Sequence, residues 1–243
     1  MTDGPITEPG TGCAPSAVPW PAGPHYFDLT GSEGTVAWVR YRVWAADWYA
    51  NTLRSIVGPD GNYDRLVGIE MALDGALNSL SGAFDAGTAF LIQGAETALD
   101  LDESDRLPVH WYSWMNARDL LSMPAIGTDP DGTSNDDVWR VILDIDTALA
   151  GEGDPTPSGW LAQLRRLRNQ VAHQDTLARH HVAGGPSTVR AFGGRNVDAF
   201  TYLARACDQV HDLTEQMVSL AIRLGAREVH AAWERPRWIP TVD

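Results

Sequence analysis

The segment RLRNQVAHQ, residues 166–174, places an arginine, an asparagine and a histidine close together. Arg168 and Asn169 are adjacent, and His173 follows four residues after Asn169. A histidine with a pKa near neutrality can take a proton from a ribose 2′-hydroxyl or give one to a leaving 5′-oxygen. An arginine can hold a phosphate and the charge that grows in the transition state, while an asparagine can orient the histidine or the sugar. The segment therefore predicts chemistry on a ribose–phosphate linkage that needs no metal and yields a 2′,3′-cyclic phosphate.

The charge of this region is opposite to the charge of the whole chain. The 243 residues carry a formal net charge of −14, from 18 basic and 32 acidic residues, and every basic residue is an arginine. Residues 158–181 contain four arginines and one aspartate, which leaves a net +3 before any histidine is counted. An anionic surface repels nucleic acid on average, so RNA binding must depend on this local basic patch. We expect Arg165 and Arg166 to bind substrate beside Arg168.

A helix must position these side chains. Thr156 is a suitable N-cap for a helix that reaches about His181. Its apolar residues recur at helical spacing and predict a stripe that faces the core: Trp160, Leu164, Leu167 and Val171. On a straight helix Arg168 and His173 point about 140° apart, so one helix closes the pair poorly. We therefore expect a composite site at the interface of a homodimer.

The remaining pattern predicts an all-α bundle of about six helices, because we find no convincing strand alternation. The glycines between residues 75 and 87 indicate either one interrupted helix or two helices in the second stretch. The other predicted helices are Glu33–Val57, Tyr63–Leu99, Pro108–Met123, one capped by Ser134 or Asn135 and ending at Ala150, and Asn196–Leu224. We expect residues 1–24 to be a disordered Pro/Gly-rich arm, residues 25–231 to be a single helical bundle domain, and residues 232–243 to be a tail.

Composition narrows the class of protein further. Hydrophobic residues make up 44% and charged residues 21%, which is ordinary for a globular chain. The two cysteines show neither a disulfide framework nor metal-ligand spacing, and no signal peptide or membrane-spanning run is evident, so we expect a cytoplasmic protein. His173, His180 and His181 lack a further ligand at a known spacing, so we expect no metal and no cofactor.

Arg168, Asn169 and His173 together resemble the motif of the HEPN family of helical domains. That motif is an arginine, often followed directly by asparagine, with a histidine after four to six intervening residues. The resemblance covers the motif helix and the helical order around it. It implies an endoribonuclease that acts on RNA as a toxin, in anti-phage defence or in RNA processing, with an inhibitory or antitoxin protein as a further partner. In one toxin–antitoxin group a tyrosine two residues past the histidine is nucleotidylated; Asp175 stands there in this chain.

Two alternatives remain at this point. A non-catalytic HEPN-like scaffold that binds a partner protein is the second function, and it predicts that Arg168 pairs with a nearby carboxylate and faces no open cleft. A helical ligand-binding protein is the third, although no pocket signature supports it. Arg205 with His211 also has the loose spacing of the motif but lacks the asparagine, so we treat that pair as coincidence.

Overall fold

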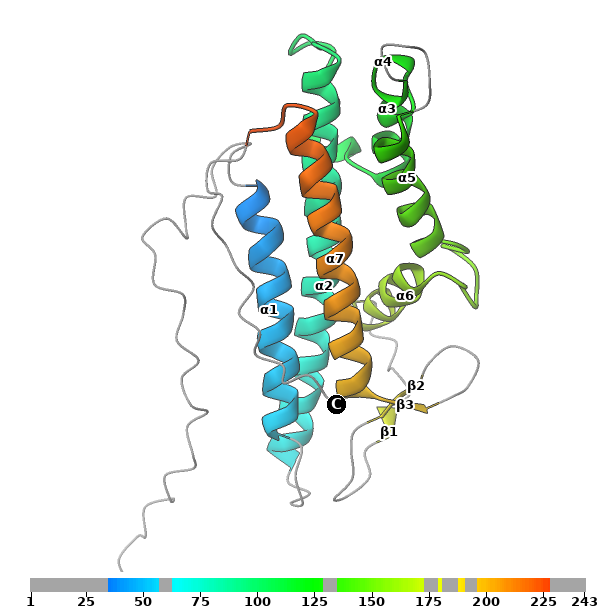
Figure 1. Cartoon of the computed structure of the whole chain (residues 1–243). Coiled ribbons are helices and arrows are strands. Elements are labelled where there is room, and N and C mark those ends of the chain that lie inside the picture. Colours follow the sequence, from blue (N-terminus) through cyan, green and yellow to red (C-terminus); the bar gives the residue numbers. More distant parts are fainter. Residues whose placement is uncertain are drawn as a thin grey trace, which may run out of the picture.

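The computed structural model describes residues 35–56, 63–128, 135–172, 179–180, 188–190 and 196–227. Within these ranges the chain is mostly helical, so the predicted all-α bundle is confirmed (Figure 1). The predicted arm and tail lie outside the described residues. The elements are α1 Thr35–Ile56, α2 Tyr63–Ala98, a short 3₁₀ turn Val109–Trp111, α3 Trp114–Leu121, α4 Pro124–Gly127, α5 Asp136–Ala148, α6 Trp160–Ala172, β1 Arg179–His180, β2 Thr188–Arg190, β3 Asn196–Asp198 and α7 Ala199–Arg223.

Three long helices, α1, α2 and α7, lie side by side and form most of the core (Figure 1). Helices α3, α4 and α5 stand together beside α2, and α6 lies below α5 in the same view. Along α7 the apolar residues that recur at helical spacing are buried, namely Leu203, Cys207, Val210, Met217 and Leu220. Burial of these side chains contributes most of the stability of such a bundle.

The long second stretch is one continuous helix, α2, and its glycines are points of close packing. Gly68, Gly75 and Gly82 recur every seven residues, and the α1 side chains that lie over them are, in the same order, Ile56, Tyr49 and Arg42. On the α7 side, a Cβ at Gly94 would lie 2.8 Å from the carbonyl oxygen of Ala221. The glycines therefore let α1 and α7 approach α2 closely. Packing against these two helices supports α2 along its length, so the glycines do not interrupt it.

The predicted single helix Pro108–Met123 is wrong, because a cap at Ser113 divides this segment into the 3₁₀ turn and α3. The hydroxyl of Ser113 accepts a hydrogen bond from the backbone N–H of Asn116, which starts α3 at Trp114. Pro124 occupies the first position of α4. The prediction of the following helix is confirmed, since the Asn135 side chain caps α5.

The region between α6 and α7 differs from the prediction. The predicted extension of the motif helix to His181 is wrong, because α6 ends at Ala172 and Arg179–His180 forms a strand. The three strands form a small antiparallel sheet in the order β1-β2-β3. The last helix begins at Ala199 instead of at Asn196, because Asp198 accepts a hydrogen bond from Thr201 N–H and caps it. Backbone pairing across short strands with little alternation is decided by tertiary contacts, and the sequence pattern does not reveal it.

Candidate functional site

Helix α6 carries the motif and packs its apolar side against α2 and α5. Leu161, Leu164 and Leu167 are buried, which confirms the predicted stripe at two of its positions. The start of the helix lies very close to the end of α5, since a Cβ at Gly159 would meet the carbonyl oxygen of Ala148. The Gly159 N–H donates to the carbonyl of Ala150 at 2.8 Å. These contacts hold the motif helix against two neighbours and leave its polar side outward.

Arg165 is held by carboxylates on two sides. Its Nη1 lies 2.8 Å from Asp85 Oδ1 on α2, and its Nε lies 2.8 Å from Glu152 Oε1 in the α5–α6 loop. The same guanidinium lies over the ring of Phe84, 5.6 Å from its centroid. Arg165 therefore joins α6 to α2, and two of its nitrogens, Nη1 and Nε, already face carboxylates within the protein.

Arg168 is held much more loosely. Its Nη1 donates a hydrogen bond of 2.9 Å to Asn169 Oδ1, so the structure brings these two motif residues into direct contact. Its Nη2 lies 4.0 Å from Asp85 Oδ2, at the outer limit of an ion pair. Within the described ranges its buried Nε has no hydrogen-bond partner, although 35% of the side chain is exposed. Arg168 thus retains donors that an added anion can use.

Arg166 and Asn169 complete the described part of the predicted site. Arg166 Nη1 donates to the carbonyl of Asp154 at 3.1 Å, which ties it to the loop before α6. Asn169 is exposed. His173 follows directly after Ala172, the last residue of α6, but lies outside the described residues. The predicted meeting of His173 with Arg168 and the predicted dimer interface therefore stay predictions.

Arg42 of α1, which was not among the predicted site residues, lies against α2 next to this site. Its guanidinium carbon is 3.4 Å from the position that a Cβ of Gly82 would occupy. Asp85, which faces Arg165 and Arg168, is three residues further along the same helix, and residues at that spacing are neighbours on a helix surface. The seven-residue spacing of residues 42, 49 and 56 against residues 82, 75 and 68 was the signal that could have revealed this contact.

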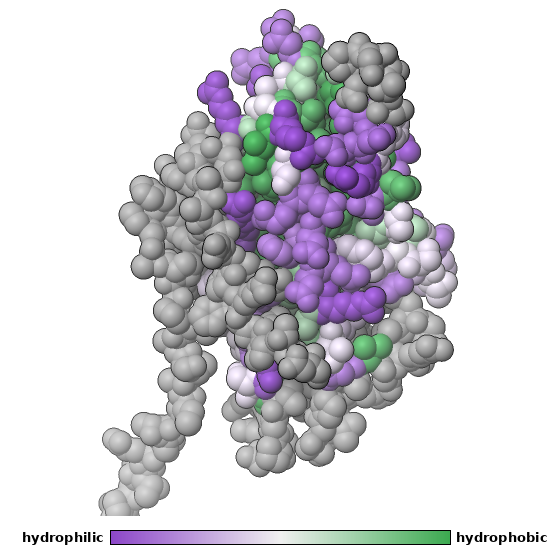
Figure 2. All heavy atoms as spheres, viewed as in Figure 1, coloured by the Kyte–Doolittle hydropathy of each residue, from purple (hydrophilic) through white to green (hydrophobic). Residues whose placement is uncertain are grey.

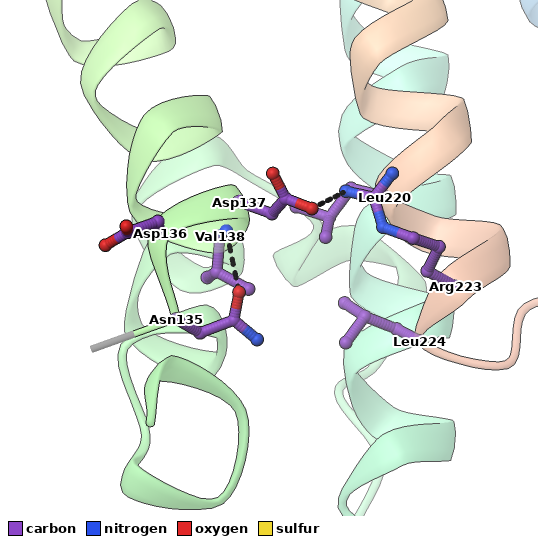
Figure 3. Close-up of a pocket in the computed structure, with 7 residues that line it drawn as sticks. All are labelled: Asn135, Asp136, Asp137, Val138, Leu220, Arg223 and Leu224. Carbon is purple, nitrogen blue, oxygen red and sulfur yellow. Dashed lines mark hydrogen bonds and ion pairs between the residues drawn. The ribbon is translucent and has the colours of Figure 1, made fainter. Parts of the chain in front are cut away.

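A second candidate is a pocket of about 410 Å³ between the start of α5 and the end of α7 (Figure 3). Val138, Leu220 and Leu224 supply its apolar wall. Asp137 points towards Arg223, with 3.7 Å between Oδ2 and Nη2, and it also accepts from Arg140. The lining residues include no histidine or cysteine, and Asp137 already faces Arg223, so we assign no reaction to this pocket.

Across the ranges that the structure describes, no three His, Cys, Asp or Glu side chains gather in a way that could hold a metal ion. In the same ranges, every helix is too short or too polar to cross a bilayer.

Comparisons of the chain with protein-family models, with curated proteins and with solved structures found no match.

Proposed function

We propose that this protein is a HEPN-like, metal-independent endoribonuclease of the cytoplasm, which cuts RNA to a 2′,3′-cyclic phosphate. The observation that carries the proposal is the contrast between two arginines on α6. Arg165 is held at 2.8 Å by both Asp85 and Glu152, whereas Arg168 has one close hydrogen bond, to Asn169, and lies 4.0 Å from Asp85. The motif arginine is thus the less committed of the two and keeps more of its charge and donors for a phosphate. Arg165 and Arg166 contribute positive charge near the substrate.

The reaction needs one nucleophile, one base and one acid. The ribose 2′-oxygen attacks the adjacent phosphorus and loses its proton to His173, while the 5′-oxygen of the next nucleotide leaves and takes up a proton. Arg168 binds the non-bridging oxygens, where negative charge grows. Asn169 holds the guanidinium in place, because its Oδ1 accepts the hydrogen bond that Arg168 Nη1 donates. The balance is one bond formed, one bond broken and one proton moved from the 2′-oxygen to the 5′-oxygen, so no cofactor is required.

A homodimer supplies the two halves of the site in this proposal, with Arg168 from one protomer and His173 from the other. Large apolar side chains that such a contact can bury are exposed next to α3, at Val109, Trp111 and Met115. The face in Figure 2 is mostly hydrophilic along α7, which runs down its centre, with more hydrophobic surface towards its upper part. The proposal places the protein in defence, as a toxin or anti-phage effector, or in RNA processing, with an inhibitory or antitoxin protein as its partner.

The direct test is cleavage of RNA by the purified full chain in the presence of EDTA. We expect cyclic-phosphate products from the wild type, none from His173→Ala, and at least a hundredfold slower cleavage by Arg168→Ala. His211→Ala is the matched control, because that histidine also follows an arginine at loose spacing but without the asparagine. Equal cleavage by His173→Ala and the wild type would rule out the proposal.

Mixing variants tests the composite site. Arg168→Ala and His173→Ala are inactive separately, but a heterodimer of the two retains one intact site if each site draws on both protomers. A 1:1 mixture is then expected to recover about a quarter of wild-type activity, because half of the dimers are heterodimers with one site of two. No recovery after subunit exchange would place both residues of a site in one protomer.

A non-catalytic scaffold is the second candidate, and one observation favours it. Asp85 lies between Arg165 and Arg168, 4.0 Å from the latter, so Arg168 has a carboxylate nearby as that function predicts. In a scaffold, Arg168→Ala would weaken capture of a partner protein, and the purified chain would leave RNA intact under all conditions.

A further inference from the structure

Arg42 is a cation that has no counter-charge in the part of this strongly acidic chain that the structure describes. Among the described residues it forms no ion pair, and its buried Nε has no hydrogen-bond partner. The contact that the structure gives its guanidinium is with an aromatic ring, since the group lies over Trp38 at 4.4 Å from the ring centroid. With 32 acidic residues available for 18 arginines, such a side chain is unusual. A buried donor without a partner costs free energy, and a ligand that accepts from it removes that cost.

The side chain is also held in position. Trp38 stacks on Tyr41, with 5.1 Å between centroids and 20° between planes, so the ring beneath the guanidinium is itself supported. On the other side, Gly82 leaves room for Arg42 to lie directly on α2. A planar cation between an aromatic ring and a helix backbone keeps its fork of donors in a defined direction. Arg42 is therefore arranged for a ligand with a fixed geometry.

Arg42 and Arg168 reach the same strip of α2, between Gly82 and Asp85, from different helices. Arg42 comes from α1 and lies over Gly82, while Arg168 comes from α6 and faces Asp85. These two α2 positions are separated by three residues, or about 4.5 Å along the helix axis. Asp85 and Glu152 both face Arg165 at 2.8 Å, so the two carboxylates set against Arg42, Arg165 and Arg168 leave one positive charge in excess. Both Arg42 and Arg168 have a buried Nε without a partner among the described residues.

We infer that Arg42 and Arg168 form the two ends of one groove for single-stranded RNA across α2, in which Arg42 binds a backbone phosphate next to the scissile one. This inference rests on the proposed function for the identity of the ligand. Trp38 acts as a positioning residue, because its ring is covered by Arg42 and Tyr41 and is not free to stack on a base. Both arginines contact phosphates and neither contacts a base. The groove is therefore expected to bind a longer RNA more tightly than a shorter one, with little dependence on base sequence.

The test is binding of 2′-O-methyl RNA, which lacks the attacking hydroxyl and so cannot be cleaved. Fluorescently labelled dinucleotide and octanucleotide probes, the first with a single internucleotide phosphate, are titrated with the full chain across a range of salt concentrations. For Arg42→Ala we expect about tenfold weaker binding of the octanucleotide and a salt slope lower by about 0.7, the value for one lost phosphate contact on a single strand. Dinucleotide binding is expected to be unchanged. Arg42→Lys keeps the positive charge but loses the forked guanidinium, so its affinity for the octanucleotide is expected to lie between those of the wild type and Arg42→Ala.

Arg205→Ala is the matched control, since it removes one exposed positive charge from α7. Octanucleotide affinity and salt slope that are the same for Arg42→Ala, Arg205→Ala and the wild type would overturn the groove, and so would a wild type that does not bind the octanucleotide. A polyglutamate peptide that binds through Arg42 while the octanucleotide does not would assign the strip to an acidic protein partner instead. Circular dichroism and thermal unfolding verify that each variant is folded.

The two proposals fail separately. If octanucleotide binding depends on Arg42 but no RNA is cut in EDTA, the nuclease proposal is wrong and the proposed RNA groove stands. If cleavage depends on His173 but Arg42→Ala binds like the wild type, the groove is wrong and the nuclease remains.

Discussion

Arg165 of α6 and Asp85 of α2 lie 2.8 Å apart, and this pair joins the motif helix to the centre of the bundle. Glu152 contacts the same guanidinium from the loop that leads into α6. One turn later, Arg168 faces the same aspartate at 4.0 Å. Two arginines on one helix therefore have different roles, since the first anchors the helix and the second keeps donors for a ligand.

The different roles of Arg165 and Arg168 predict different losses in the free energy of unfolding when each is replaced by alanine. Arg165→Ala removes two ion pairs that are partly screened by solvent, so we expect a loss of about 1 kcal/mol in the free energy of unfolding. Arg168→Ala removes a hydrogen bond to its own neighbour, Asn169, and is expected to change that free energy by less than about 0.5 kcal/mol. Urea unfolding followed by circular dichroism measures both. A larger loss for Arg168→Ala than for Arg165→Ala would contradict the assignment of roles.

Close packing of α2 predicts opposite effects for two glycine substitutions. In Gly94→Ala the new methyl group would lie 2.8 Å from the Ala221 carbonyl oxygen, so α7 must move away, at a cost of about 1–3 kcal/mol. In Gly82→Ala it would lie 3.4 Å from Arg42, an ordinary contact, and alanine favours a helix by up to about 1 kcal/mol over glycine.

The melting temperature of Gly94→Ala is therefore expected to fall below that of the wild type, and the melting temperature of Gly82→Ala is expected to lie above it. Equal tolerance of both would mean that α2 and α7 are further apart than described.

Glu96 links α2 to the loop before α3. It is 3% exposed, and its Oε1 accepts a hydrogen bond of 2.8 Å from the backbone N–H of Leu107. Glu96→Ala leaves that N–H without its partner, so we expect a loss of about 1–3 kcal/mol in the free energy of unfolding. Glu96→Gln keeps an acceptor oxygen and is expected to lose less. Chemical denaturation at neutral pH compares them, and equal losses would show that the charge matters and the hydrogen bond does not.

Burial raises the pKa of Tyr202 well above its ordinary value near 10. The unfolded chain therefore loses this proton before the folded chain does. The stability that Tyr202 contributes is fully present below pH 10 and is lost as the pH rises above it, by up to about 1.4 kcal/mol per pH unit. Phenylalanine cannot ionise, so the free energy of unfolding of Tyr202→Phe is expected to rise relative to that of the wild type between pH 9 and 11 in urea unfolding experiments. A difference that is independent of pH would contradict the burial of this hydroxyl.

The helices were predictable to the extent that local signals define them. Spacing of apolar residues and the Asn135 cap located α5, and the same spacing located most of α7. The predicted helix from Pro108 was wrong because Ser113, which lies inside the predicted range, caps a new helix that starts at Trp114. The strand at Arg179–His180 had no signal of its own, because its pairing with Thr188–Arg190 is made in three dimensions.

By itself the sequence determined the helical class, the buried stripes and the motif of Arg168, Asn169 and His173, because periodicity and residue type are local properties. Only the tertiary structure decided that Arg165 lies 2.8 Å from Asp85 while Arg168 lies 4.0 Å from it, and that Arg42 of α1 lies on the same strip of α2. Asp85 and Arg165 are 80 residues apart, and partners so distant meet only when the helices that carry them have packed together.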